Sequence, residues 1–302
     1  MLWPVTGSSF GPRRLGASGI AVSALGVGTN RWGAQGVPES QLEATFSTSL
    51  DCGVVLFDSA EVYAAGRSER ILGRCSRNDP RPVVLASKFA PYPTRVRAAQ
   101  LDRALEATLK RMARASIDLY YLHFPYSLVR IEAWMDRMAI AVESGKIRAV
   151  GVSNCNAAQM RRARDALGRR GLPLAANQVQ YSLLHRKPER NGVLAACREL
   201  DVALVAYQPL GRGLLGARLA PTSGAAARRN AAVLDALELI AHERGVTPSQ
   251  VALNWLLCQD EMLIAIPGAT SAAHAAENAG ALAWRLSGQE LDRLDVASAN
   301  IR

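Results

Sequence analysis

Four polar residues stand at or just after the ends of three strand-like runs of the sequence. Asp58 ends VVLFD and Tyr63 follows it closely, Lys88 ends VVLASK, and His123 ends IDLYYLH. In a barrel of parallel strands the carboxyl ends of the strands meet at one face, so these side chains would converge there. A carboxylate, a phenol, an amine and an imidazole together can protonate a carbonyl oxygen while another group delivers hydride.

Taken singly, Tyr63 could be a surface or packing residue and His123 a core histidine. A lysine that ends a buried strand, however, needs a partner to offset its lost hydration, and Asp58 can provide one. A free tyrosine titrates at a pH of about 10, and a neighbouring Lys88 would favour the phenolate and lower the pKa of Tyr63. His123 would then orient the carbonyl or share the proton.

The elements that must position these residues form a regular alternation. Eight runs rich in Val, Ile, Leu and Tyr, mostly continuous in their apolar character, indicate strands buried on both faces, as in parallel sheets. They are residues 22–28, 54–58, 83–88, 117–123, 147–153, 176–182, 202–207 and 262–268. Because helical segments separate them, the sequence predicts an α/β fold, a single (β/α)8 barrel over residues 1–302, with a short N-terminal hairpin across its bottom.

Helices are predicted by apolar spacing at 40–51, 100–113, 131–143, 157–167, 190–200, 225–243, 248–258 and 287–295, with another starting near 272. Ser40 is the expected N-cap of the first of them. Ser287 and Glu290 fit a capping box for the C-terminal helix. The stretch 218–229, with Pro221, Gly224 and an alanine run, is the expected mobile loop over the site.

Composition excludes several classes of function. The net charge is +10, from 36 basic and 26 acidic residues, but the arginines are spread along the chain. Their one dense stretch, 161–170, fits a solvated helix face, and no nucleic-acid-binding motif is present, so we expect no nucleic-acid partner. No apolar run has the length of a signal peptide or a membrane span. We therefore expect a cytoplasmic protein without a membrane partner.

Five cysteines stand at positions 52, 75, 155, 197 and 258. Their odd number and wide spacing do not indicate a disulfide framework. The four histidines show no metal-ligand spacing among themselves or with the cysteines, and we expect no metal site.

Seven segments carry a resemblance to a known family. In order they are FDSAEVYAAGRSERILG, ASKFAP, IDLYYLHFP, IRAVGVSN, ANQVQYSLLHR, VALVAYQPLGRGLLG and IPGATSAAHAAENAGAL. From about residue 15 to 294 the chain closely resembles the aldo-keto reductases. The segment RKPERNG is similar to a subgroup of that family found in plants and bacteria. The resemblance implies that Asp58, Tyr63, Lys88 and His123 are catalytic, with Tyr63 as proton donor to an aldehyde or ketone.

The resemblance also implies an extended site for NADP(H), with NAD(H) possible, over the C-terminal face. The nicotinamide end matches Ser153, Asn154 and Gln178 at the carboxamide and Tyr207 against the ring. The pyrophosphate loop matches Gln208, Leu210, Arg212 and Gly213, and the adenosine end matches Gly268, Thr270, Ser271, His274, Glu277 and Asn278. Barrel enzymes often bind phosphate in the loops after strands seven and eight, where glycines and a helix N-terminus offer backbone N–H groups.

The adenosine end departs from the family pattern. Many members carry Lys or Arg near Gly268, Thr270 or His274 to hold the 2′-phosphate of NADP. Arg212 and Ser271, with Thr270 and a protonated His274, could still bind that phosphate. We expect NADPH to be preferred, on the strength of the resemblance and the basic charge.

The loop after the second strand also differs from the family. Ser59 and Ala64 stand where threonine and glycine are commoner. We expect both replacements to have mild effects.

The expected substrate pocket has aromatic walls, which suit an apolar or aromatic carbonyl compound. The candidate wall residues are Trp32, Phe89, Phe124 and Tyr126. The natural substrate and the physiological direction stay open, and for the oligomeric state we expect a monomer or a weak homo-oligomer.

Three other interpretations compete with a reductase. One is a regulatory protein of the same fold that senses the cofactor's redox state with little turnover. The glycine and serine content of the adenosine loop is similar to that of such regulatory family members. Another is an aldolase with Lys88 as a Schiff base, which the pairing of Asp58 with Tyr63 disfavours. The third is a Rossmann fingerprint at 211–216 with Asp235, but six strand–helix units precede it and no clean helix follows.

Overall fold

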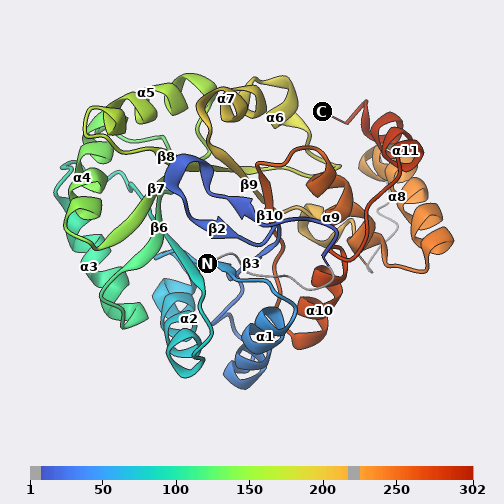
Figure 1. Ribbon diagram of the computed structural model, residues 1–302, viewed down its shortest axis with the longest axis horizontal. Helices are drawn as coiled ribbons and strands as arrows, with labels where there is room; N and C mark the ends of the chain where they lie inside the picture. Colours follow the sequence, from blue (N-terminus) through green and yellow to red (C-terminus); the bar gives the residue numbers. More distant parts are fainter. Residues whose placement is uncertain (1–7, 217–224, 302) are drawn as a thin grey trace.

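The structure is a computed structural model, and it describes residues 8–216 and 225–301. At its centre eight parallel strands pair in sequence order and form a closed barrel, because the first strand also bridges to the last at Leu25–Ala265 and Gly28–Gly268 (Figure 1). The barrel strands are β3 (Gly26–Gly28), β4 (Leu56–Asp58), β5 (Val84–Phe89), β6 (Ile117–Leu122), β7 (Ile147–Ser153), β8 (Leu174–Gln180), β9 (Ala203–Tyr207) and β10 (Leu263–Ile266). The predicted (β/α)8 barrel is confirmed.

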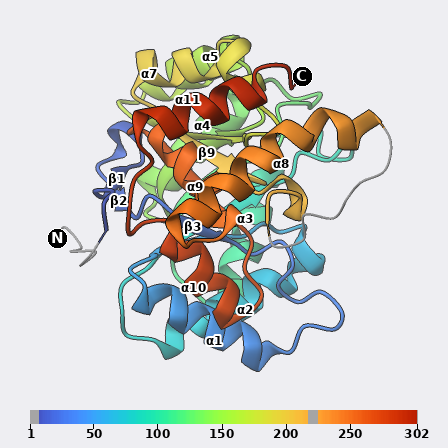
Figure 2. The ribbon, with the colours of Figure 1, turned by 90° about the vertical axis from the view of Figure 1, so that its right-hand side faces the viewer.

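Helices surround the barrel (Figure 1). They are α1 (Glu39–Asp51), α2 (Arg67–Asn78), α3 (Gln100–Met112), α4 (Ile131–Glu143), α5 (Ala157–Gly168), α6 (Lys187–Arg190), α7 (Val193–Leu200), α8 (Ala225–Arg244), α9 (Pro248–Cys258), α10 (Ala272–Gly280) and α11 (Gly288–Ser298). The last of these, α11, packs against α8 on the outside of the helix layer (Figure 2). Ser287 and Glu290 form the predicted capping box at its start.

Side chains alternate between the two faces of each barrel strand, so every second residue points into the barrel. Leu56, Val84, Ala86, Leu119 and Ala149 belong to one interior cluster, while a larger cluster fills the space between strands and helices. On each strand these inward-pointing side chains continue to the carboxyl end. The next inward-pointing residue beyond the last apolar one therefore faces the open end of the barrel.

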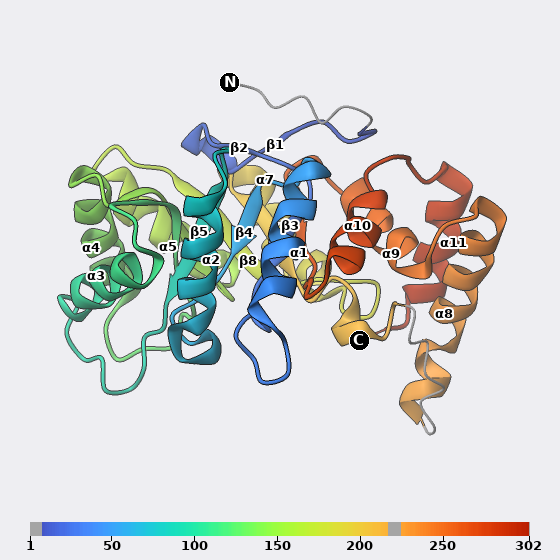
Figure 3. The same cartoon turned by 90° about the horizontal axis from the view of Figure 1, so that it is seen from below.

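A short antiparallel hairpin closes the opposite end, as predicted. It consists of β1 (Arg13–Arg14) and β2 (Ala21–Val22), and Figure 3 shows it across one end of the barrel. Leu15, Ile20 and Val22 belong to the interior cluster. At the turn, Gly16 has a φ of 49°, and a Cβ there would lie 2.3 Å from the carbonyl oxygen of Asp201, so only glycine fits.

Several predicted boundaries are wrong. The strand predicted at 22–28 is two elements, because the Ser23 hydroxyl bonds to the Leu25 carbonyl and to the Val55 amide and interrupts the run. The helix predicted at 40–51 begins at Glu39, and Ser40 does not cap it. The helix predicted at 190–200 is divided at Gly192, which has a φ of 79°.

Two further segments differ from expectation. Helix α2 was not predicted, because its sequence RSERILGRCSRN is strongly polar: of its buried residues only Ile71, Leu72 and Cys75 are apolar, apart from Gly73. Of the loop expected at 218–229, residues 225–229 belong to α8, and 218–224 lie outside the described residues.

Arginine–carboxylate pairs join neighbouring helices on the outside of the ring. Arg137 of α4 pairs with Asp102 of α3, and Arg162 of α5 pairs with Glu132 of α4. Arg244 of α8 pairs with Glu290 of α11. Much of the basic charge thus lies in ion pairs at the surface, including part of the arginine-rich helix α5.

The five cysteines are free thiols. Within residues 8–216 and 225–301, no group of three or more His, Cys, Asp or Glu side chains could hold a metal ion. None of the described helices combines the length and apolar character that crossing a membrane requires.

Candidate active site

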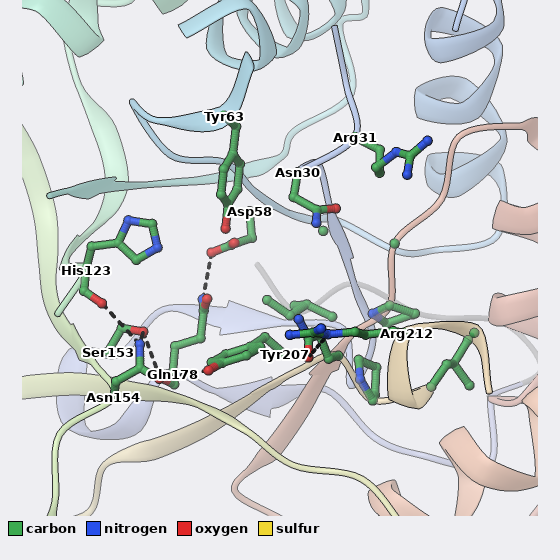
Figure 4. A pocket seen from close by; sticks show the side chains of 18 of the residues that line it. Asn30, Arg31, Asp58, Tyr63, His123, Ser153, Asn154, Gln178, Tyr207 and Arg212 are labelled. Carbon is green, nitrogen blue, oxygen red and sulfur yellow. Dashed lines mark hydrogen bonds between the residues drawn. The ribbon is translucent and has the colours of Figure 1, made fainter. Parts of the chain in front are cut away.

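A cavity of about 680 Å³ opens at the carboxyl ends of the strands. Most of the residues that the sequence assigned to the site line it, and they come from separate strand ends (Figure 4). They are Asp58, Tyr63, His123, Phe124, Ser153, Asn154, Gln178, Tyr207, Gln208, Leu210, Arg212, Gly213 and Gly268. The alternation of the strands explains this convergence, since Asp58, Gln178 and Tyr207 each lie two residues beyond an interior side chain.

Lys88 lies beneath the cavity, fully buried, with its ammonium group among three acceptors. Its Nζ pairs with Asp58 Oδ1, donates to the Ser59 carbonyl over 2.7 Å, and lies 3.4 Å from the Tyr63 hydroxyl. Burial on its own lowers the pKa of Lys88, but Asp58 and Tyr63 outweigh it, and the pKa is raised. Lys88 is therefore a fixed cation under the tyrosine.

Tyr63 faces the cavity with its hydroxyl toward Lys88. Burial raises the pKa of Tyr63 and Asp58 adds to this, while Lys88 opposes both. The prediction that Lys88 acts to lower the pKa of Tyr63 holds for its own effect, but the net shift is upward because desolvation is larger. At neutral pH Tyr63 thus carries its proton and can donate it.

His123 is nearly buried, and its ring stacks on Phe124 at 4.3 Å between centroids and meets the Tyr63 ring edge-on at 6.1 Å. Burial, together with the Lys88 cation, lowers the pKa of His123 to about 3. Its Nδ1 is buried without a hydrogen-bond partner in the described part of the chain. A carbonyl compound in the cavity would therefore meet the other ring nitrogen of this neutral imidazole, which can form a hydrogen bond without adding charge.

One hydrogen-bonded network connects the opposite wall to the catalytic set (Figure 4). The Tyr207 hydroxyl donates to Asn154 Oδ1 over 2.9 Å, and Asn154 Nδ2 donates to Ser153 Oγ over 3.0 Å. Ser153 Oγ donates to the Gln178 carbonyl over 2.8 Å. Gln178 Nε2 donates to Asp58 Oδ2, also over 2.8 Å. The amide groups that would meet a nicotinamide carboxamide are therefore coupled to the carboxylate that holds Lys88.

The outer end of the cavity suits an anion. Arg212 is exposed there, bonds to Gln208 Oε1 over 3.3 Å, and has no acidic partner in the described residues. Both residues have left-handed backbones, with φ of 60° and 51°, in a turn that continues through Gly213. Since a cation and an open glycine-containing backbone favour a phosphate group, these residues fit a dinucleotide's pyrophosphate.

The adenosine end that the sequence predicted is only partly open. Thr270, Ser271 and His274 lie beyond the cavity wall at the start of α10, where Ser271 caps the helix by accepting from the His274 amide. Glu277 accepts from the Thr247 hydroxyl over 3.0 Å, and Asn278 is buried. Those two residues take part in the packing of α9 on α10.

Two of the predicted pocket walls are core residues. Trp32 is fully buried, and its indole donates to the Ala269 carbonyl over 2.8 Å. Phe89 is also fully buried and packs on Trp134, because it follows the inward-facing Lys88 and so points to the helices. Phe124 does line the cavity, whereas Tyr126 is 77% exposed and does not.

Several wall residues were not predicted from the sequence, among them the polar Asn30 and Arg31. These two follow the end of β3 in the way that Tyr63 follows β4, so the same strand-end rule could have found them. The aromatic side chain of Trp32 was selected in their place, although aromatic character alone does not tell whether a side chain faces the cavity or the core.

Comparisons with known proteins agree along nearly the whole chain. The model of the Aldo/keto reductase family matches residues 24–299. Pyridoxal reductase, chloroplastic, of Arabidopsis thaliana is 34% identical over 99% of this chain and 87% of its own length. Aldo-keto reductase yakc [NADP(+)] of Schizosaccharomyces pombe is 33% identical over 92% of this chain and 89% of its own.

Solved structures show the same architecture. The crystal structure of an aldo-keto reductase from Klebsiella pneumoniae in complex with NADPH superposes with a TM-score of 0.79 and is 31% identical, covering 94% of both chains. The similarity in sequence and the similarity in fold therefore extend over the same residues.

Proposed function

The chain belongs to the aldo/keto reductase family, and on this basis we propose that it is an NADP(H)-dependent oxidoreductase that reduces an aldehyde or ketone with Tyr63 as proton donor. The observation that carries the proposal is the Tyr63 hydroxyl 3.4 Å from the buried Lys88 cation, at the wall of a cavity whose far end suits a dinucleotide. Two relatives support the choice of cofactor: the Klebsiella pneumoniae structure contains NADPH, and the name of the Schizosaccharomyces pombe protein includes NADP(+).

When bound, the reduced nicotinamide supplies the hydride. The carbonyl oxygen gains negative charge as hydride arrives, and Tyr63 gives it a proton. Lys88 stabilises the phenolate that remains, and Asp58 keeps Lys88 in place. His123, neutral at the pH of catalysis, orients the carbonyl oxygen beside the Tyr63 hydroxyl through the ring nitrogen other than its buried Nδ1. In the reverse direction the phenolate would accept the proton of an alcohol.

The wall opposite Tyr63 is the proposed nicotinamide site. Ser153, Asn154 and Gln178 present hydroxyl and amide groups for the carboxamide, and the Tyr207 ring offers a stacking face. Gln208, Leu210, Arg212 and Gly213 would follow the pyrophosphate. Thr270, Ser271 and His274 would hold the adenosine end, with Gly268 leaving space for it.

Phe124, stacked on His123, is the apolar wall that faces a substrate. An apolar or aromatic carbonyl compound is the class that suits such a wall.

The test is consumption of NADPH by purified protein in the presence of a panel of aromatic aldehydes. Tyr63→Phe should lower kcat by about 100- to 10,000-fold, because general acid catalysis is removed. Tyr92→Phe, in an exposed tyrosine away from the cavity, is the matched control and should retain activity. Tight cofactor binding without Tyr63-dependent turnover would contradict the proposal and favour the redox-sensing alternative.

A further inference from the structure

A buried carboxylate lies behind the catalytic tyrosine and does not line the cavity. Glu69, in the first turn of α2 and six residues after Tyr63, is fully buried. Its Oε1 accepts from the Ser87 hydroxyl over 2.6 Å, and its Oε2 pairs with Arg111 Nε. Arg111 Nη2 also donates to Thr108 Oγ1 over 3.2 Å. A buried charge needs such a partner, so Glu69 holds Arg111 in one place.

Arg111 packs directly on the segment that carries Tyr63. That segment, Tyr63–Gly66, is a tight turn with non-helical backbone angles inside it, and Gly66 is its last residue. A Cβ on Gly66 would lie 2.5 Å from Arg111 Cδ and 2.7 Å from Nε. The other side of Glu69 reaches Ser87, the residue before Lys88 on β5. The Glu69–Arg111 pair therefore connects the backbone of the tyrosine segment to the strand of the lysine.

The tyrosine segment has a backbone that needs external support. Ala64, Ala65 and Gly66 have φ of 47°, 52° and 80°, three left-handed residues in succession. The left-handed conformation is unfavourable for alanine, so the segment would relax if its contacts were removed. Ser68, next to Glu69, fixes the same turn by bonding to the Ser59 hydroxyl over 2.9 Å and the Thr29 carbonyl over 2.9 Å.

We propose that Glu69 and Arg111 are positioning residues for proton transfer: their ion pair presses on the Gly66 turn and keeps the Tyr63 hydroxyl opposite Lys88. The inference rests on the proposed function, since it concerns the proton donor of that reaction. Without the pair, the hydroxyl would move away from Lys88 while the cofactor wall, on other strands, stayed unchanged.

The test compares Arg111→Met with Arg137→Met. Arg137 forms the corresponding pair one helix further around the ring, with Asp102, and does not line the cavity. In Arg111→Met, kcat should fall about 10- to 100-fold, as small misplacements of reacting groups do, with the Kd for NADPH within twofold of wild type. Because Lys88 would act less on Tyr63, the alkaline fall of kcat should also move to higher pH. Arg137→Met should change neither quantity.

Two further variants keep the inference falsifiable if Arg111→Met does not fold. Arg111→Lys retains the charge and should recover part of kcat, and Glu69→Gln retains the Ser87 bond but should lower kcat with Kd unchanged. If Arg111→Met or Glu69→Gln folds and keeps the kcat and the pH profile of the wild type, the inference is overturned. Should the wild type show no Tyr63-dependent turnover, the proposed function fails separately. Hydrogen exchange of residues 59–69, faster in these variants than in Arg137→Met, then tests the support of the segment directly.

Discussion

His123 and Tyr63 face the same cavity, and burial shifts the pKa of the two groups in opposite directions. The His123 imidazole, with its pKa lowered to about 3, is neutral from mildly acidic pH upward, and the Tyr63 phenol keeps its proton to higher pH than in water. Both shifts have the same cause, because a desolvated side chain favours its neutral form. The site thus keeps two neutral hydrogen-bonding groups beside one fixed cation, Lys88. That arrangement suits the proposed reduction, since the negative charge that would develop on a carbonyl oxygen would meet the Tyr63 proton and the Lys88 cation.

The lowered pKa of His123 leads to a prediction about stability. In the unfolded chain a histidine binds a proton below a pH of about 6.5, whereas His123 in the folded protein does so only near pH 3. Between these values the unfolded state binds more protons, so the free energy of unfolding should decrease as the pH falls, by up to about 1.4 kcal/mol per pH unit.

Urea denaturation at pH 7, 6 and 5 checks this, with His123→Gln as the comparison. The variant should lose less stability than the wild type over that window, because its glutamine does not titrate. His185, whose pKa burial also lowers, is present in both proteins and cancels in the difference. Equal pH dependence of the two proteins would contradict the shift.

At the scale of single residues, the sequence could predict polar side chains at the ends of strands whose earlier side chains point into the barrel. Asp58, Lys88 and Gln178 are polar where the pattern of a buried strand requires apolar side chains, and that contrast is visible without a structure. Glu69 and Arg111 could not be found in this way, because charged residues on a helix usually face solvent. Phe89 was misassigned because aromatic side chains fit a cavity and a core equally well.

At the scale of elements, the hairpin at the bottom of the barrel gives a sharp prediction. Gly16→Ala should destabilise the protein by about 3 kcal/mol, because it combines a left-handed alanine with a Cβ 2.3 Å from the Asp201 carbonyl oxygen. Gly19→Ala, in the same hairpin with a φ of 75° and open space around it, should cost only about 1 kcal/mol.

Urea unfolding of both variants measures the difference. The Kd for NADPH should stay within twofold of wild type in each, since the hairpin lies at the other end of the barrel from the cavity. Equal costs for the two substitutions would show that the close approach at Gly16 contributes nothing.

The succession of strands and helices was predictable, and the boundaries were less so. Continuous apolar runs indicate buried strands, but the interruption at Ser23 depends on a hydroxyl that bonds to the backbone of a neighbouring strand. Helix α2 was missed because its buried face is partly polar, so its sequence lacks the apolar periodicity of a helix. Gly192 divides a helix that periodicity alone would continue.

Over the whole molecule, the net charge of +10 should assist binding of an anionic cofactor. Much of the basic charge is neutralised in pairs between helices, but Arg212 at the cavity is exposed and has no acidic partner in the described residues. We expect the Kd for NADPH to rise about threefold to tenfold as sodium chloride increases from about 0.05 to 0.5 M, because salt screens exposed charges.

Fluorescence quenching at several salt concentrations measures this dependence. Arg212→Gln should weaken binding at low salt and reduce the slope, whereas Arg137→Met, remote from the cavity, should leave both nearly unchanged. A salt-independent Kd in the wild type would contradict the electrostatic contribution.

The hairpin at the barrel bottom has a consequence for the order of events during synthesis. Leu15, Ile20 and Val22 are translated well before the backbone that Gly16 packs against, at Ala175 and Asp201. At about 5–20 residues per second, the apolar hairpin residues remain without their final partners for on the order of ten to forty seconds. The hairpin therefore reaches its final place only after residues 175–201 have been made, and the nascent chain offers a chaperone an apolar target throughout that interval.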